Sequence, residues 1–159
     1  MHASFKALAL LAAVASASAT SFKLKAHVTD FDLSPSLEGK EVTVENDTGY
    51  AYLTAPGSGA TFTDANNSID TDATGQEFHI HITPGGTATV PSANVVTFGP
   101  TPGTQGVAAA NGKLAYEDGV FTACPASVLQ KEGDNVLISY KLAGQRTLAG
   151  CANVELQEA

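Results

Sequence analysis

The 159-residue chain contains no tryptophan and few basic residues: eight lysines and arginines stand against 16 aspartates and glutamates, for a formal net charge of −8. A chain without a lysine- or arginine-rich stripe has little with which to neutralise phosphates, which argues against a nucleic-acid partner. Anionic lipid surfaces repel the same negative charge. Sugar-binding clefts commonly use flat aromatic platforms, so the lack of tryptophan counts against such a cleft, although the four tyrosines could supply some of these platforms. The tyrosines are Tyr50, Tyr52, Tyr116 and Tyr140.

Sequence signatures of catalysis are also missing. There is no G-x-S-x-G nucleophile elbow, no P-loop, no dinucleotide fingerprint and no zinc knuckle. Carboxylates are numerous, and a glycosidase needs only two of them facing a sugar, so a glycan-active enzyme stays open as an alternative. We expect a protein without enzymatic activity and without a bound cofactor.

A long apolar run occurs only near the start of the chain. Residues 7–14 read ALALLAAV, follow a polar segment with Lys6, and precede a stretch of small residues. These are the three parts of a secretory signal peptide. Ala17-Ser18-Ala19 fits the small-x-small cleavage rule, and Ala15-Ser16-Ala17 is a second candidate. The run is too short to cross a bilayer, which takes about 20 apolar residues, so we expect no membrane span.

We therefore predict a signal peptide over residues 1–19, a single domain over residues 20–159, and secretion. Removing the signal peptide takes away Lys6 and no carboxylate, so the formal charge of −8 becomes −9. Export brings Cys124 and Cys151 into an oxidising compartment, where one intramolecular pairing is open to them. We expect a structural disulfide there, and two free thiols are the alternative.

Two N-glycosylation sequons lie in polar, turn-like stretches. They are Asn46-Asp47-Thr48 and Asn66-Asn67-Ser68. Such stretches are accessible to a glycosyltransferase, so we predict Asn46 and Asn66 as glycosylation sites of a eukaryotic secreted protein.

Alternation of apolar and polar residues is the main structural signal after the leader. Residues 22–28 place four apolar side chains on one face and Lys23, Lys25 and His27 on the other, as in a half-buried strand. Similar short runs recur between segments rich in glycine and proline, and no window has a helical period. The pattern predicts an all-β fold, an antiparallel β-sandwich or barrel. The predicted strands cover 22–28, 41–45, 50–53, 60–63, 78–82, 94–98, 113–116, 120–123, 135–142 and 152–156.

The sequence also predicts several local features: one hairpin turn, the faces of particular side chains, and one helical turn. The Glu-Asp-Gly turn at 117–119 predicts a hairpin between the strands on either side of it. In the strand over 41–45, Glu41 falls on the polar side. In the strand over 135–142, Val136, Ile138, Tyr140 and Leu142 share one face. Residues 126–131 predict a single helical turn after Pro125.

Histidines give the first candidate site. His79 and His81 point to the same face of a predicted strand, where two imidazoles can share a metal ion. His27 lies on the polar side of the first strand, so three histidines would converge in a zinc or copper site if the strands were neighbours. The alternative is that all three are solvated on an outer sheet face. The segment Asp70-Thr-Asp72-Ala-Thr74-Gly75 resembles the front half of a calcium loop, but its twelfth position is His81 and not glutamate.

Four segments carry a family resemblance. They read NGKLAY at 111–116, GVFTACP at 119–125, GCANVEL at 150–156 and FKLKA at 22–26. With these the chain resembles the small secreted fungal proteins related to the cell wall protein PhiA, which include fungal allergens. The resemblance implies a cell-wall or extracellular protein linked to the development of spore-bearing cells, with no enzyme activity.

These observations lead to one main functional hypothesis and two alternatives. We expect a non-enzymatic, secreted, cell-wall-associated protein of a filamentous fungus, tied to conidiation or wall structure, whose partner is a cell-wall polysaccharide. The first alternative is a secreted effector or elicitor acting on a host. The second is a glycan- or metal-binding secreted protein.

Overall fold

The computed structural model describes residues 21–159, so the predicted signal peptide over residues 1–19 lies outside the described residues. Short antiparallel strands and two 3₁₀ turns make up the regular structure of this part. The predicted all-β fold is confirmed, and it contains a closed barrel. The elements are β1 (Ser21–Phe22), β2 (Leu24–Asp30), β3 (Glu41–Val44), β4 (Ala51–Thr54), β5 (Phe62–Ala65), β6 (Ser68–Thr71), β7 (Phe78–His81), β8 (Thr97–Gly99), β9 (Val107–Ala108), η1 (Ala110–Gly112), β10 (Ala115–Tyr116), β11 (Val120–Pro125), η2 (Ala126–Leu129), β12 (Val136–Lys141) and β13 (Ala152–Glu158).

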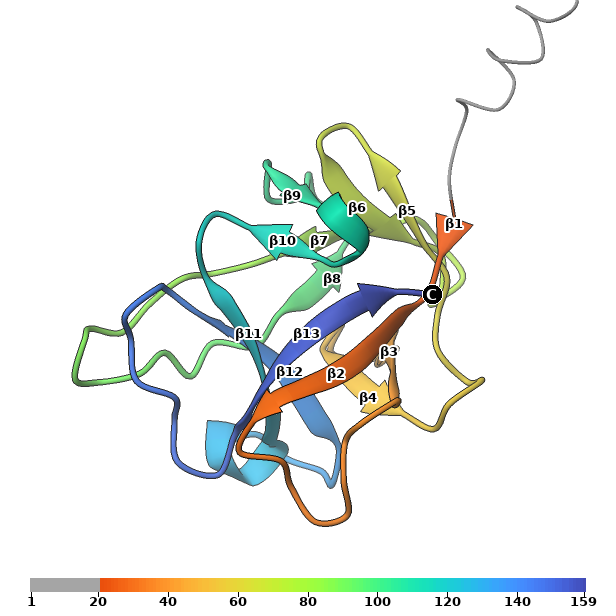
Figure 1. Cartoon of the computed structure of the whole chain (residues 1–159). Coiled ribbons are helices and arrows are strands. Elements are labelled where there is room, and N and C mark those ends of the chain that lie inside the picture. Colours follow the sequence, from red (N-terminus) through yellow and green to blue (C-terminus); the bar gives the residue numbers. More distant parts are fainter. Residues whose placement is uncertain (1–20) are drawn as a thin grey trace, which may run out of the picture.

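Six strands form the barrel, in the order β11-β12-β4-β3-β2-β13, and β13 closes it by pairing with β11 (Figure 1). All six strands place apolar side chains in one shared core, and β11 and β12 are buried on their other face as well. The predicted face of the first strand is confirmed, since Phe22, Leu24 and Ala26 are buried. Members of the core from the barrel strands are Leu24, Ala26, Val42, Val44, Ala51, Leu53, Phe121, Ala123, Ile138, Tyr140, Ala152, Val154 and Leu156.

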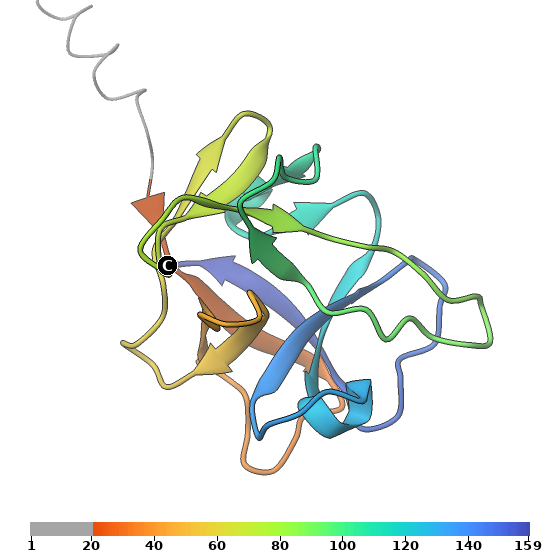
Figure 2. The ribbon, with the colours of Figure 1, turned by 180° about the vertical axis from the view of Figure 1, so that it is seen from behind.

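A second antiparallel sheet, in the order β1-β5-β6-β7-β8, lies beside the barrel. Figures 1 and 2 show it from opposite sides, above the barrel strands. Its apolar side chains join the barrel core, and the rings of Phe62 and Phe98 lie 5.4 Å apart within it. Ile69 and Ile80 on neighbouring strands are almost completely buried in the same core. The other face of this sheet is therefore left for polar side chains.

The predicted disulfide between Cys124 and Cys151 is confirmed. Cys124 lies on β11 and Cys151 directly precedes β13, so the bond joins two neighbouring barrel strands. Both cysteines belong to a second apolar cluster, separate from the main core, which includes Leu129 of η2 and Leu137 of β12. The predicted helical turn after Pro125 is also confirmed as η2. Within residues 21–159, no helix is long and apolar enough to cross a membrane.

The predicted hairpin around residues 117–119 is wrong. The turn itself forms, with the Gly119 N–H donating to the Tyr116 carbonyl at 3.3 Å. However, β10 pairs with β9, because β12 and β13 already occupy the two edges of β11. The turn therefore leads the chain from the small β9-β10 ribbon into the barrel.

Two side chains differ in exposure from what the pattern predicts, although Glu41 does lie on the predicted face of its strand, opposite Val42 and Val44. Leu142 is 37% exposed because β12 ends at Lys141, and the following turn is closed by Gln145, whose Oε1 accepts the Leu142 N–H at 2.9 Å. Glu41 is 5% exposed, because the Gly59 N–H donates to its carboxylate at 2.9 Å and Lys23 lies 3.8 Å away. The backbone amides of Gly57 and Gly59 hold the pKa of Glu41 below its ordinary value, with a smaller contribution from Lys23.

Candidate functional site

The strand register builds a polar row on the outer face of the five-stranded sheet. Thr63 on β5 lies opposite Asp70 on β6, and Asp70 lies opposite His79 on β7. Directly opposed residues of antiparallel strands project from the same face, so the three side chains are neighbours. The intervening residues, such as Ile69 and Ile80, face the core.

Asp70 and His79 form the closest polar pair of this row. The Nδ1 of His79 lies 2.7 Å from the Oδ1 of Asp70. The Asp70 side chain is 12% exposed and the His79 side chain 22% exposed, so the hydrogen bond is largely shielded from solvent. An ionised carboxylate only accepts hydrogen bonds, so His79 donates through Nδ1. The pairing fixes the orientation of the imidazole ring.

A loop segment covers this pair. The Thr104 N–H donates to the Ile80 carbonyl at 2.9 Å, and the Ser68 hydroxyl donates to the Thr104 carbonyl at 2.7 Å. Gly103 packs so closely that a Cβ there would lie 2.7 Å from the Ser68 hydroxyl and 3.1 Å from the His79 Cβ. Only glycine allows this approach without a shift of the neighbouring atoms. The glycine- and proline-rich stretch that marks a loop in the sequence is thus the cover of the polar row.

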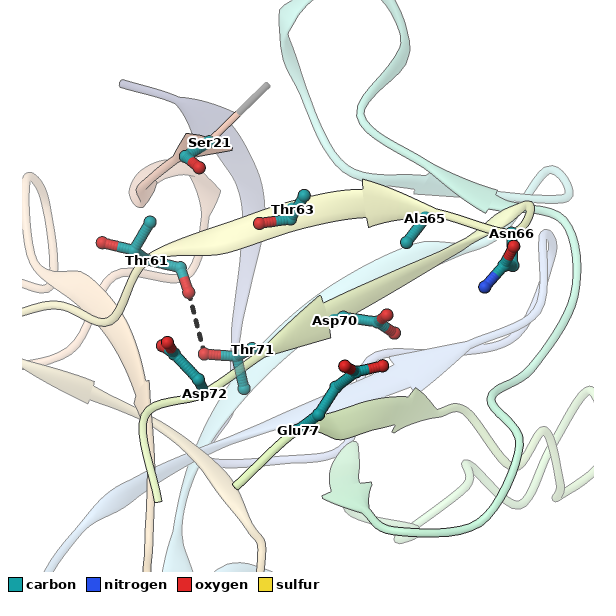
Figure 3. Close-up of a pocket in the computed structure, with 9 residues that line it drawn as sticks. All are labelled: Ser21, Thr61, Thr63, Ala65, Asn66, Asp70, Thr71, Asp72 and Glu77. Atoms are coloured by element: carbon teal, nitrogen blue, oxygen red, sulfur yellow. Dashed lines mark hydrogen bonds between the residues drawn. The ribbon is translucent and has the colours of Figure 1, made fainter. Parts of the chain in front are cut away.

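A pocket of about 380 Å³ opens on the other side of Asp70. In Figure 3 the carboxyl groups of Asp70 and Glu77 point into the same space, from β6 and from the residue before β7. Thr71, at the end of β6, is held by a hydrogen bond from its hydroxyl to the Thr61 carbonyl at 2.8 Å. Most groups that line the pocket are hydroxyls, amides or carboxylates. The lining residues are Ser21, Thr61, Thr63, Ala65, Asn66, Asp70, Thr71, Asp72 and Glu77.

The three histidines predicted as a metal site have different partners. The Nε2 of His81 lies 3.2 Å from the Thr101 hydroxyl, and the Nδ1 of His27 lies 3.1 Å from Glu38 on the barrel side. Of the three, only His79 belongs to a group that could hold a metal ion. That group consists of Asp70, Glu77 and His79, and it is the one such group of three or more ligands among residues 21–159.

The segment that resembles a calcium loop has another conformation. Asp70 lies within β6, where its carboxylate contacts His79, so it does not line a loop. The turn begins after the strand, with the Gly75 N–H donating to the Asp72 carbonyl at 2.9 Å. This turn brings Glu77 back beside Asp70. The segment therefore contributes its carboxylates to the row across the sheet.

Comparison with known proteins assigns the chain to a family. Residues 19–159 match the family described as a domain of unknown function (DUF7907). The chain belongs to the DUF7907 family. No curated protein matches the chain, and no solved structure does. The family description names no activity, so the site itself is the main evidence for the function of this DUF7907 domain.

The two sequons of the DUF7907 domain lie in exposed turns. Asn46 is exposed between β3 and β4, and Asn66 is exposed between β5 and β6. Asn66 and Asn67 have φ values of 52° and 60°, the left-handed conformation that a two-residue hairpin turn requires and that asparagine tolerates well. Asn66 also lines the pocket of Figure 3. Glycosylation at both asparagines stays a prediction, and a glycan at Asn66 would stand at the rim of the site.

Proposed function

We propose that this protein is a secreted, non-enzymatic component of the fungal cell wall that binds a wall polysaccharide in the pocket of Figure 3. The observation that carries the proposal is the chemistry of the pocket lining. Threonine hydroxyls, the Asn66 amide and the carboxylates of Asp72 and Glu77 offer both donors and acceptors, which sugar hydroxyls need. The volume of about 380 Å³ lies within the range of ligand pockets.

Secretion is supported by the covalent structure. A disulfide persists in oxidising compartments and is rare in reducing ones. The family match begins at residue 19, where the predicted signal peptide ends. Two exposed sequons are consistent with passage through a secretory pathway.

The segments that carry the PhiA-like resemblance lie close together in the fold. Residues 119–125 contain β11, and residues 150–156 contain Cys151 and most of β13. The two strands pair with each other, and the disulfide joins the two segments. Residues 111–116 reach the same region, since Lys113 forms a β-bridge with Gln157. The resemblance therefore rests on one contiguous part of the barrel. Membership in the PhiA-like group remains a proposal, and with it the link to conidiation.

A role without catalysis is consistent with the contacts of the strongest candidate base. Among the described residues, the Nε2 of His79 has no hydroxyl or thiol within hydrogen-bond distance that could serve as a nucleophile. The Ser68 hydroxyl, which lines the adjacent cavity, is committed to the Thr104 carbonyl. Neither group therefore shows the contact of a nucleophile that is activated by an adjacent general base.

The test is a pull-down of the full chain, secreted from a eukaryotic host, on insoluble chitin, β-glucan and mannan. We expect retention on one of them. Thr63→Val should weaken binding about three- to tenfold, because it removes one hydroxyl from the pocket without changing its shape. Thr43→Val is the matched control, because Thr43 is a half-buried strand threonine of the barrel that lies outside the pocket.

Three results would argue against the proposal. Retention on none of the three polymers removes the polysaccharide partner. Release of reducing sugar from any of them indicates an enzyme. Recovery of the protein free in culture fluid, with none in purified walls, favours the secreted effector.

A further inference from the structure

The group formed by Asp70, Glu77 and His79 borders the proposed sugar pocket and also has the features of a metal centre. The ligand atoms of the three residues all lie within 4.8 Å of one another. Aspartate, glutamate and histidine together are the oxygen and nitrogen donors that zinc accepts. No lysine or arginine occurs among the described residues that line either cavity beside the group. Among the described residues, neither carboxylate has a lysine or arginine within ion-pair distance.

The Asp70–His79 hydrogen bond prepares the imidazole for coordination. Because Nδ1 carries the hydrogen that is donated to Asp70, the Nε2 of the neutral ring carries the free lone pair. In metalloproteins, a ligating histidine usually donates its other ring N–H to a carboxylate in this way, which fixes the tautomer and raises the basicity of the ligand. Asp70 is 8% exposed, and the loop at Gly103 packs closely against the Cβ of His79.

The free nitrogen is directed toward a second ligand. The Nε2 of His79 lies 4.0 Å from the Oε1 of Glu77. That distance is too long for a hydrogen bond. Two ligands bound to a tetrahedral zinc ion at about 2.0–2.1 Å lie about 3.3–3.4 Å apart, so Glu77 has to move about 0.6 Å closer to Nε2 for the two to share an ion. The Glu77 side chain is 72% exposed and free to adjust.

Space for the remaining ligands is present. Glu77 and Asp70 line the pocket of about 380 Å³, and a cavity of about 240 Å³ lies on the other side, next to His79. A metal ion between His79 and Glu77 would keep its open positions toward solvent, where water completes the coordination. Such a site is open, in contrast to a closed structural zinc site with four protein ligands.

We propose that His79, through Nε2, and Glu77 bind a zinc ion on the outer face of the five-stranded sheet, with Asp70 as the positioning residue of His79. The site differs from the three-histidine site considered from the sequence, since neither His27 nor His81 takes part. It adds a metal ion to the protein and does not depend on the identity of the polysaccharide.

The test is calorimetric titration of the untagged, chelator-treated full chain with zinc chloride at neutral pH. We expect a single zinc ion per chain. His79→Ala and Glu77→Gln should each weaken binding by at least about tenfold. The control variants His81→Ala and His27→Ala should bind zinc like the wild type, because each removes a histidine with a different partner. Glu77 is exposed, so Glu77→Gln should fold like the wild type. It therefore tests the site even if His79→Ala does not fold.

Asp70 is tested by comparing two substitutions. Asp70→Ala should weaken zinc binding about 10- to 100-fold, as the loss of an outer-shell partner does. Asp70→Asn keeps an oxygen that accepts the Nδ1 hydrogen, so it should recover part of the affinity. Thermal unfolding of each variant without zinc separates this effect from a loss of fold.

Several outcomes would overturn the proposal. Wild-type protein that does not bind zinc at millimolar concentration has no such site. Equal binding by the wild type and both the His79→Ala and Glu77→Gln variants places the ion elsewhere. Calcium chloride that displaces zinc at equal concentration indicates an unspecific acidic surface, because calcium prefers oxygen ligands alone. None of these results decides polysaccharide binding, which is measured separately on chelator-treated protein.

Discussion

Removal of the disulfide is the perturbation whose effect can be worked out most directly. In the variant Cys124→Ala/Cys151→Ala, the folded chain keeps its strand pairing, since β11 and β13 are hydrogen-bonded to each other independently of the sulfurs. The alanines preserve the apolar character of the second cluster around Leu129 and Leu137. Most of the effect should therefore fall on the unfolded chain, which gains freedom when the loop opens.

The expected magnitude follows from the size of that loop. The two cysteines are 27 positions apart in the sequence. Closing a loop of this length lowers the entropy of the unfolded chain by an amount worth about 3–4 kcal/mol at 25 °C. A single domain has a free energy of unfolding of about 5–15 kcal/mol in total, so the loss is a large fraction of it. The variant should remain folded at 25 °C only if the other interactions of the barrel supply more than this loss of about 3–4 kcal/mol.

The assay is urea unfolding of the secreted full chain, followed by circular dichroism at 25 °C. The double variant should lose about 3–4 kcal/mol, and wild-type protein in the presence of a reductant should lose a similar amount. The slope of the free energy against urea should rise, because the unfolded chain without the bond exposes more surface. A loss below about 1 kcal/mol in both samples would refute the argument. So would a loss in the variant that reduction of the wild type does not reproduce.

Two further predictions concern buried positions of the barrel. The pKa of Glu41 is lowered in the folded state, so its contribution to stability is present above the unfolded pKa of about 4.5 and is lost as the pH falls below that value. Glu41→Gln should therefore flatten the decline in the urea midpoint as the pH falls below about 4.5, and an unchanged slope would contradict the role of this carboxylate. Gly119→Ala should destabilise the protein by about 2–3 kcal/mol, because a Cβ there would lie on the Tyr140 ring, which is buried between Phe121 and Tyr116. A thermal midpoint equal to that of the wild type would show that the ring has room to move.

The sequence predicted best those strands that are buried on one side only. The strands near residues 22–28 and 152–156 alternate cleanly, and the structure places their apolar residues in the core. Alternation is a local property that each strand carries by itself. The disulfide was predictable for a similar reason, because two cysteines allow one intramolecular pairing.

Strands buried on both sides were harder to recognise. All four residues of β6 are buried, including Ser68, Asp70 and Thr71. Its sequence, SIDT, has no apolar alternation, since the loop at Gly103 covers the polar face. β12 is also buried on both faces, with Leu137 in the disulfide cluster and Ile138 in the main core, but the alternation of Val136, Ile138 and Tyr140 still predicted it. Which segment covers a face depends on the tertiary structure, and alternation does not reveal it.

The candidate site was missed for a related reason, although its residues lie within ten positions of one another. A calcium-loop reading places Glu77 in the wrong position, because it assumes that residues 70–77 wrap around an ion. In the structure residues 68–71 are a strand, and the chain returns to pair Asp70 with His79. The alternation of β7 already directed His79 away from the core, so the missing information was the partner strand. An acidic residue on one strand, followed after a tight turn by Glu-x-His on the next, is thus the pattern that would have indicated this site.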